Sequence, residues 1–423
     1  MRLTRLSPLL LLAAAPAFAT QAHGGATTAY YDAAYRAVLH PEQGTIDVEL
    51  NLAGERLPSS ITLRIDPQHY KGFTSTDPLQ VGATHVTWHP QGRKSRLRYQ
   101  FVVNHERSPQ HYDSLMRSDW ALFRGDKMVP RVTVKARRHL HSRASIEFVL
   151  PPQWSIATQY APREDAPSGT AHFDFDDPER RFDRPGGWML AGKIGSRGEK
   201  IGPVRVIIAA PVGDNARRQD MLAFLNWNLP RLLDVFPSFP RRVLVVTAGD
   251  PMWRGGLSGP ASIFLHSDRP LISENRTSAL LHEFVHVALG IRADEESDWI
   301  VEGLAEFYSI ETLRRSGGIS EHRYKQAIAG LERWARRSAT LFAPSSTGAT
   351  TARAVVTLRA VDGEIRAATH DRASLDDLAR RLAAERGTVS LERLQRVAQE
   401  AAGRPLRSLQ REQLMKPLAA PAQ

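Results

Sequence analysis

The sequence predicts an α+β chain of several domains, and three observations lead to this prediction. Residues 26–200 contain short segments in which apolar and polar residues alternate, which is typical of an antiparallel β domain. Residues 201–340 combine such segments with helical periodicity, and residues 341–423 are rich in Ala and Arg with helical periodicity. A chain of 423 residues is long enough to bury several hydrophobic cores.

The first nineteen residues predict that the protein is exported. A basic start is followed by an apolar run through Ala15 and by Ala-Phe-Ala at residues 17–19, which together form a secretory signal peptide over residues 1–19. The chain has no Cys, which excludes disulfide bonds and thiolate metal ligands. We therefore expect a bacterial periplasmic or secreted protein.

The net charge of +11 does not indicate a nucleic-acid partner. Arginines are scattered in pairs along the chain, and no long basic run with interleaved aromatic residues occurs. Export also argues against nucleic acid. A peripheral attraction to an anionic cell envelope is left as an open possibility, and the sequence does not indicate an oligomeric state.

In the N-terminal region, each alternating segment predicts one strand. Because these strands are short and separated by turns with Pro and Gly, they favour a sandwich or barrel over a parallel sheet. Residues 180–187 are expected to form a connecting loop before the last strand or two. The expected strands are residues 45–52, 59–65, 97–103, 132–135 and 145–150.

The remaining elements follow from periodicity in the same way. A glycine-rich stretch, Gly-Gly-Leu-Ser-Gly at residues 255–259, would allow another backbone to approach closely, although a plain surface turn explains it too. The C-terminal helices are expected to form a small bundle that closes over a cleft in the domain of residues 201–340. We expect strands at residues 204–210, 243–246 and 262–265, and helices at residues 217–236, 353–367, 374–385 and 391–402.

The sequence His-Glu-Phe-Val-His that begins at His282 carries the strongest chemical signal. It lies in an apolar-periodic segment, residues 277–289, which predicts a helix that ends at Gly290. Residues four apart lie on one helix face, so the imidazoles of His282 and His286 point towards a common centre. Two neutral imidazoles can bind zinc there, and Glu283 lies beside them as a candidate general base.

A second helix, predicted over residues 298–308, is expected to complete the metal site. Its apolar sequence is interrupted by Glu302 and Glu306, which are four apart and share a face. Burying a bare carboxylate is costly, so each needs a partner. A metal ion would serve Glu302, and the free N–H of a ligand histidine would serve Glu306. Ser297 or Asp298 is placed to cap this helix.

These two segments resemble the gluzincin metallopeptidases, specifically the aminopeptidase N-like and glycyl aminopeptidase families. The third-ligand segment of that family reads much like Asn-Glu-Gly-Phe-Ala-Glu-Tyr, and residues 301–308 read Val-Glu-Gly-Leu-Ala-Glu-Phe-Tyr. Residues 313–324 and 374–378 resemble the glycyl aminopeptidase branch. The resemblance extends over about residues 30–410.

The resemblance implies a thermolysin-like zincin catalytic domain that contains Zn²⁺ and hydrolyses a peptide or protein substrate. Glu283 would be the catalytic base, and Glu306 would orient a ligand histidine. The substrate backbone would add as an extra strand beside the glycine-rich stretch. The implied zinc ligands are His282, His286 and Glu302, and the implied substrate-binding residues are Gly255, Gly256, Leu257 and Ser258.

The sequence departs from the family pattern in three places. Residues 287–301 give a connection of fifteen residues, which is shorter than usual. Ser258 stands where the family has a glutamate that holds a free amino terminus. The segment at residues 349–354 lacks the family tyrosine that stabilises the oxyanion, which leaves Tyr308, Tyr324 or His370 as side-chain options.

The sequence therefore predicts a zinc metallopeptidase and does not decide between exopeptidase and endopeptidase activity. The alternative is a catalytically weakened, zinc-containing protein that binds peptides or assists envelope assembly. The intact base and ligand pattern favours the enzyme, because a binding protein has no need for Glu283.

Overall fold

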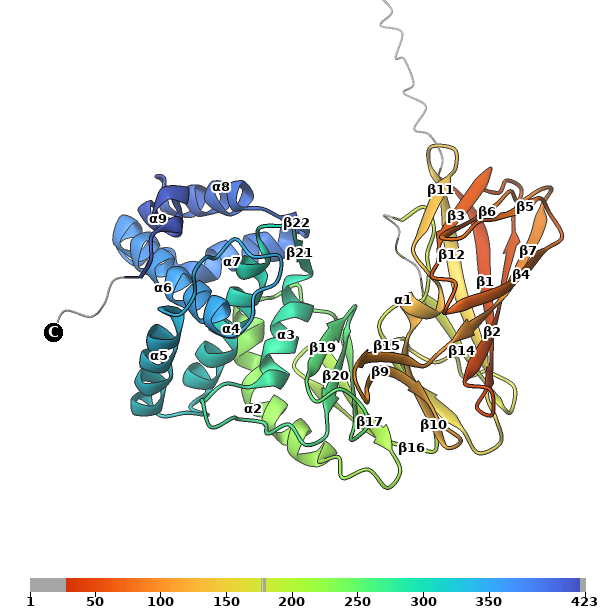
Figure 1. Cartoon of the computed structure of the whole chain (residues 1–423), viewed down its shortest axis with the longest axis horizontal. Coiled ribbons are helices and arrows are strands. Elements are labelled where there is room, and N and C mark those ends of the chain that lie inside the picture. The colour runs from red at the N-terminus through yellow and green to blue at the C-terminus, as the bar shows by residue number, and fades with distance from the viewer. Residues whose placement is uncertain (1–27, 176, 178–179, 419–423) are drawn as a thin grey trace, which may run out of the picture.

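The computed structural model describes residues 28–175, 177 and 180–418. In Figure 1 a β domain lies at the right, a second sheet in the middle and most helices at the left. The predicted signal peptide, residues 1–19, lies outside the described residues and stays a prediction. Within the described ranges, every helix is too short or too polar to cross a membrane.

The strands of the β domain form sheets of six, five and four strands, ordered β14-β12-β1-β2-β7-β4, β13-β15-β10-β9-β8 and β11-β3-β6-β5. Pairing is antiparallel except between β1 and β12, which are parallel. The elements are β1 (Ala29–His40), β2 (Thr45–Ala53), β3 (Ser60–Arg64), β4 (Tyr70–Ser75), β5 (Leu79–Val81), β6 (His85–Trp88), β7 (Lys94–Val102), β8 (His105–Ser108), β9 (His111–Met116), β10 (Trp120–Arg124), α1 (Gly125–Met128), β11 (Val132–Lys135), β12 (Leu140–Val149), β13 (Ser155–Ala157), β14 (Thr170–Phe175) and β15 (Trp188–Gly192).

The middle sheet has the order β16-β17-β18-β20-β19. Its three inner strands run parallel, and both outer strands are antiparallel to their neighbours. β16 begins at Ile194, ahead of residue 201 where the pattern placed the second domain, so one of the strands expected after residues 180–187 belongs to the middle sheet. The strands are β16 (Ile194–Ile201), β17 (Val204–Pro211), β18 (Arg242–Ala248), β19 (Gly256–Gly259) and β20 (Ser262–His266).

The two faces of the middle sheet pack against different partners. On one face, Val206, Val245 and other alternate residues share a core with the helices. On the other face, Leu244 and Val246 pack against Leu122 and neighbouring residues of β10 and β15. This second interface is an apolar seam between the β domain and the middle sheet. The near-continuous burial of β18 follows from contact on both faces.

The helices after the middle sheet bury their apolar faces in the same core as the sheet itself. Residues 341–418 are therefore not set apart by a core of their own. Gly303 allows α6 to approach α4 closely, since a Cβ there would lie 2.6 Å from the Cβ of Ala354. The elements are α2 (Arg218–Val235), α3 (Ala279–Leu289), β21 (Ile291–Ala293), α4 (Asp298–Ser316), α5 (Glu321–Ala335), α6 (Ala349–Thr369), α7 (Leu375–Glu385), β22 (Gly387–Val389), α8 (Leu391–Ala402), a 3₁₀ turn (Arg407–Leu409) and α9 (Arg411–Met415).

Candidate metal centre

The helix α3 carries the two histidines, and its ends are fixed by the sequence. At its start the hydroxyl of Ser278 accepts a hydrogen bond from the backbone N–H of Leu281 at 3.3 Å. At its end Gly290 adopts the left-handed conformation with φ +58°, which confirms the predicted stop. Leu280 and Phe284 are fully buried, and each contributes about 1.5–3 kcal/mol by burial.

The helix α4 is fixed against α3, which places Glu302 and Glu306 beside the histidines. The hydroxyl of Ser309 donates to the carbonyl of Ser278 at 2.9 Å. The expected cap of α4 is wrong: Ser297 makes no side-chain cap. The carboxylate of Asp298 instead accepts a hydrogen bond from the backbone N–H of Ser346 at 2.6 Å, so it is used to hold the segment before α6.

The side chains of His282, His286 and Glu302 converge on one point. The Nε2 atoms of the two histidines are 3.0 Å apart. The carboxylate oxygens of Glu302 lie 3.3 Å from Nε2 of His282 and 3.4 Å from Nε2 of His286. Ligands bonded tetrahedrally to zinc at about 2.0–2.1 Å would stand roughly 3.3 Å from one another. With one ligand atom taken from each residue, the three atoms lie within 4.8 Å of one another, so the two imidazoles and the carboxylate are arranged to hold a zinc ion.

Glu306 lies behind this cluster, as predicted from its spacing. Its carboxylate oxygen is 3.1 Å from Nδ1 of His282. A carboxylate in that position keeps the proton of a neutral imidazole on Nδ1 and leaves Nε2 free to bind a metal ion. Glu306 is therefore placed to orient a ligand and does not itself reach the point where the ligands converge.

The electrostatics of the cluster favour positive charge at its centre. Burial lowers the pKa of His282, but hydrogen bonds with Glu302 and Glu306 outweigh this effect and raise it to about 10. Burial and the neighbouring His282 lower the pKa of His286 to about 4. Burial opposes ionisation of Glu302, yet its contacts with both histidines hold its pKa below the ordinary value. A cation placed between these groups would satisfy all of them.

Glu283 projects from α3 towards β19, the edge strand of the middle sheet. Its side chain is 8 % exposed, and burial raises its pKa above the ordinary value. A Cβ at Gly256 would lie 3.0 Å from both Cγ and Oε1 of Glu283. The side chain and backbone of Ser258 lie beside the same carboxylate and counteract part of this rise in its pKa. Gly256 is thus needed for the close approach of helix and edge strand.

Comparison with known proteins extends this picture. The sequence matches no family model and no curated protein. An aminopeptidase N family protein from Idiomarina loihiensis superimposes with a TM-score of 0.64 over 84 % of this chain and 70 % of its own, at 14 % identity. An M1 zinc metallopeptidase from Deinococcus radiodurans gives a TM-score of 0.60 over 93 % and 94 % of the two chains, at 16 % identity.

This chain has the aminopeptidase N-like fold. The result confirms the predicted fold class and the resemblance at the level of fold. A variant of the Deinococcus radiodurans enzyme bound to a Tyr-Ser-Ala substrate also superimposes, with a TM-score of 0.58 over 93 % of this chain and 95 % of its own, at 16 % identity. Identities this low establish the architecture alone.

Two of the four residues expected to bind substrate do not face Glu283. Gly255 lies in the turn before β19, where its carbonyl accepts from the N–H of His266 at 3.0 Å. The side chain of Leu257 packs in the apolar seam. Gly256 and Ser258 are the members of the stretch that lie against Glu283.

The β domain supplies two residues that sequence reasoning did not single out. The indole Nε1–H of Trp188 donates to the carbonyl of Leu257 at 2.8 Å, and a guanidinium N–H of Arg124 donates to the carbonyl of Ser258 at 3.3 Å. Arg124 is held in turn by two hydrogen bonds to Asp126, at 3.0 and 2.8 Å. These contacts join segments far apart in the chain, so no local pattern could reveal them.

The structure brings none of the three candidate oxyanion donors to the metal cluster. The hydroxyl of Tyr308 is buried and donates to Asp376 at 3.0 Å. Tyr324 packs beneath Arg314, which lies twelve residues, or about 18 Å, along α4 from Glu302. His370 is exposed at the end of α6, about 24 Å along that helix from its contact with α4.

Proposed function

We propose that this protein is a zinc-dependent metallopeptidase. The observation that carries the proposal is the convergence of two imidazole Nε2 atoms and the Glu302 carboxylate at separations of 3.0–3.4 Å, next to the buried Glu283. Two histidines with one glutamate, leaving a fourth position open, form a ligand set typical of catalytic zinc. A purely structural site would close that position.

A zinc ion bound by these residues would supply Lewis acidity and make water acidic enough to act as a nucleophile near neutral pH. Glu283 takes a proton from the attacking water and delivers it to the leaving amine. Gly256 leaves room for the Glu283 carboxylate, and Ser258 lies beside that carboxylate and favours its charged form. Glu306 holds His282 in the orientation required of a ligand.

The edge strand β19 is the proposed binding surface for substrate backbone. Along an antiparallel pair, residues alternate between bonding to the partner strand and facing outward. Because the carbonyl of Gly255 bonds to His266 within the sheet, the backbone groups of Gly256 and Ser258 face away from β20. An extended peptide can therefore pair with Gly256 directly beside Glu283.

The outward edge is closed at Ser258, which bears on substrate choice. The guanidinium of Arg124 donates a hydrogen bond to the carbonyl of Ser258, so this carbonyl is already paired. The side chain of Ser258 has no carboxylate that could bind an ammonium group. A free amino terminus arriving at this end would meet the guanidinium of Arg124. We therefore propose that peptides with blocked amino ends are cleaved at least as fast as peptides with free ones.

A fluorogenic peptide panel with matched blocked and free amino ends tests this specificity. We expect a chelator to abolish cleavage of every substrate. We expect Arg124→Gln to raise cleavage of free peptides relative to blocked ones by up to about fivefold, because a partly exposed charge contact contributes at most ~1 kcal/mol. The matched control is Arg131→Gln, since Arg131 is exposed in the same domain.

Cleavage of free peptides alone would contradict the proposed specificity and indicate an aminopeptidase. Absence of cleavage from zinc-loaded protein would contradict the enzyme and favour the binding or envelope-assembly alternative. The structural neighbours do not favour that alternative, because they are zinc metallopeptidases.

A further test concerns Glu306. We expect Glu306→Gln to weaken zinc binding by about 10–100-fold, because Nδ1 of His282 loses a charged acceptor that fixes the ligand tautomer. Competition against a chelator of known affinity measures this change. Glu295→Gln, in an exposed loop, serves as the control, and an equal zinc affinity in the two variants would show that Glu306 does not orient His282.

A further inference from the structure

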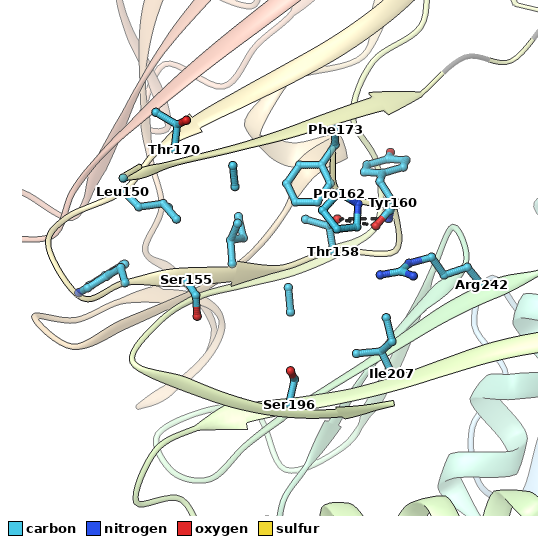
Figure 2. A pocket seen from close by; sticks show the side chains of 15 residues that line it. Leu150, Ser155, Thr158, Tyr160, Pro162, Thr170, Phe173, Ser196, Ile207 and Arg242 are labelled. Atoms are coloured by element: carbon cyan, nitrogen blue, oxygen red, sulfur yellow. Dashed lines mark hydrogen bonds between the residues drawn. The ribbon is translucent and has the colours of Figure 1, made fainter. Parts of the chain in front are cut away.

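A cavity of about 310 Å³ lies where the β domain meets the middle sheet, apart from the metal centre (Figure 2). Its upper wall comes from β13, β14 and the loop that follows β13, with the rings of Tyr160 and Phe173. Its lower wall comes from β16 and β17, with Ser196 and Ile207. None of the residues that line it contributes to the metal cluster.

Arg242, the first residue of β18, extends its guanidinium into this cavity in Figure 2. Within the described part of the chain, Arg242 makes no side-chain hydrogen bond or salt bridge, and its Nε atom is buried without a partner. An unpaired cation that has lost part of its hydration destabilises the folded protein unless an anion compensates for it. Arg242 is therefore a partly buried cation that lacks an anionic partner among the described residues.

A second arginine strengthens this electrostatic imbalance. Arg205 of β17 is aligned with Arg242 in the parallel register, so the two side chains leave the same face of the sheet on neighbouring strands. Like charges placed opposite one another are unfavourable. Burial and the nearby Arg205 both hold the pKa of Arg242 below its ordinary value. An arginine nevertheless keeps its proton in a protein, so the repulsion persists until an anion enters.

The remaining walls define what kind of anion would fit. Trp154, Ile156, Tyr160 and Phe173 are apolar or aromatic, and flat rings pack well against such walls. The hydroxyls of Ser155 and Ser196 add polar groups at the rim. A volume of about 310 Å³ is at the small end of ligand sites, which fits a small molecule better than a peptide segment.

We propose that this cavity binds a small organic carboxylate with a flat apolar body, and that Arg242 holds the carboxylate. The planar guanidinium can donate two parallel hydrogen bonds to a carboxylate. Arg205 adds attraction at longer range, and the aromatic walls cover the body of the ligand. Such a ligand would contact the β domain and the middle sheet at once, so its binding would stabilise the folded chain.

A matched pair of probes tests the need for charge: 1-naphthylacetate, which is anionic, and 1-naphthylacetamide, which is neutral and of the same shape. By isothermal titration calorimetry on the zinc-loaded protein, we expect 1-naphthylacetate to bind about tenfold or more tightly than the amide. In Arg242→Gln this preference should disappear. Arg241→Gln, which alters an exposed arginine just before the strand, should keep the preference, and zinc content should be the same in all three proteins.

A measurement on the wild-type protein covers the case in which Arg242→Gln fails to fold. We expect 1-naphthylacetate to raise the unfolding temperature and the amide to leave it nearly unchanged. The proposal is overturned if the two probes bind the wild-type protein equally, if neither binds at millimolar concentration, or if Arg242→Gln retains the preference for the anion.

Discussion

Replacing Glu283 with Gln is expected to reduce peptide hydrolysis by about 10²–10⁴-fold or more, the contribution typical of a general acid–base residue. The amide has nearly the same size as the carboxylate, so its fit against Gly256 should be kept. It cannot accept a proton from water. Zinc content should stay at the wild-type level, because Glu283 is not one of the three converging ligands.

The measurement is the steady-state rate on a blocked fluorogenic peptide, together with metal analysis of the same preparation. Glu295→Gln removes an exposed carboxylate from the loop before α4 and should keep full activity. Turnover by Glu283→Gln at the wild-type rate, with zinc bound, would refute the assignment of Glu283 as the base.

Replacing Glu302 with Ala is expected to abolish stable zinc binding and, with it, activity. The two imidazoles alone would leave the ion without the carboxylate that balances its charge. In the wild-type protein, free zinc at about 100 times its dissociation constant should stabilise the folded state by ~2.7 kcal/mol. Unfolding measured with zinc and with a chelator should show this difference in the wild-type protein and lose it in Glu302→Ala.

Circular dichroism provides the control for folding, because the partly exposed Glu302 side chain is not expected to be essential for the helix. Glu306→Gln is the matched comparison, since it removes a carboxylate one turn away yet should keep zinc at reduced affinity. If Glu302→Ala retains zinc at wild-type affinity, the ligand set is wrong and the proposed function fails with it.

The ligand cluster could be predicted from the sequence because its geometry is local. Residues four apart on a helix share a face whatever the rest of the fold does. His282 and His286 therefore had to face one common centre. Glu302 and Glu306 followed by the same rule on the next helix. Only the packing of α3 against α4 had to be supplied by tertiary structure, through contacts such as Ser309 with Ser278.

The surroundings of the cluster could not be predicted in the same way. Arg124 and Trp188 reach β19 from the β domain, across sequence separations over which no pattern carries information. Leu257 was expected in the strand that binds substrate backbone, and the alternation of that strand turns its side chain into the apolar seam. Tyr308 has a hydroxyl that could donate to an oxyanion, so the sequence offered it as a candidate. The fold instead buries this hydroxyl against Asp376 of α7.

Two smaller differences have separate causes. A strand or two was expected after residue 187, but β16 carries Ser196, Arg197 and Glu199 on a largely solvated outer strand. Hydrophobic alternation therefore did not indicate which sheet this strand joins. Asp298 is a residue type that often caps helices, but its carboxylate accepts a hydrogen bond from the backbone N–H of Ser346 instead. At Asp298 a contact with a distant segment outweighs the local preference of the residue, whereas β16 pairs with the next strand along the chain.

The apolar seam limits the relative motion of the β domain and the middle sheet. The β domain and the middle sheet meet through buried apolar side chains and not through a solvated hinge. These side chains are Leu244, Val246 and Phe264 from the middle sheet and Leu122, Trp188 and Leu190 from the β domain. Opening the seam would expose core side chains to water, so wide rocking of one half against the other is energetically disfavoured. If the chain is cut between the β domain and the middle sheet, the apolar seam becomes exposed on both parts, and we expect the separated parts to aggregate.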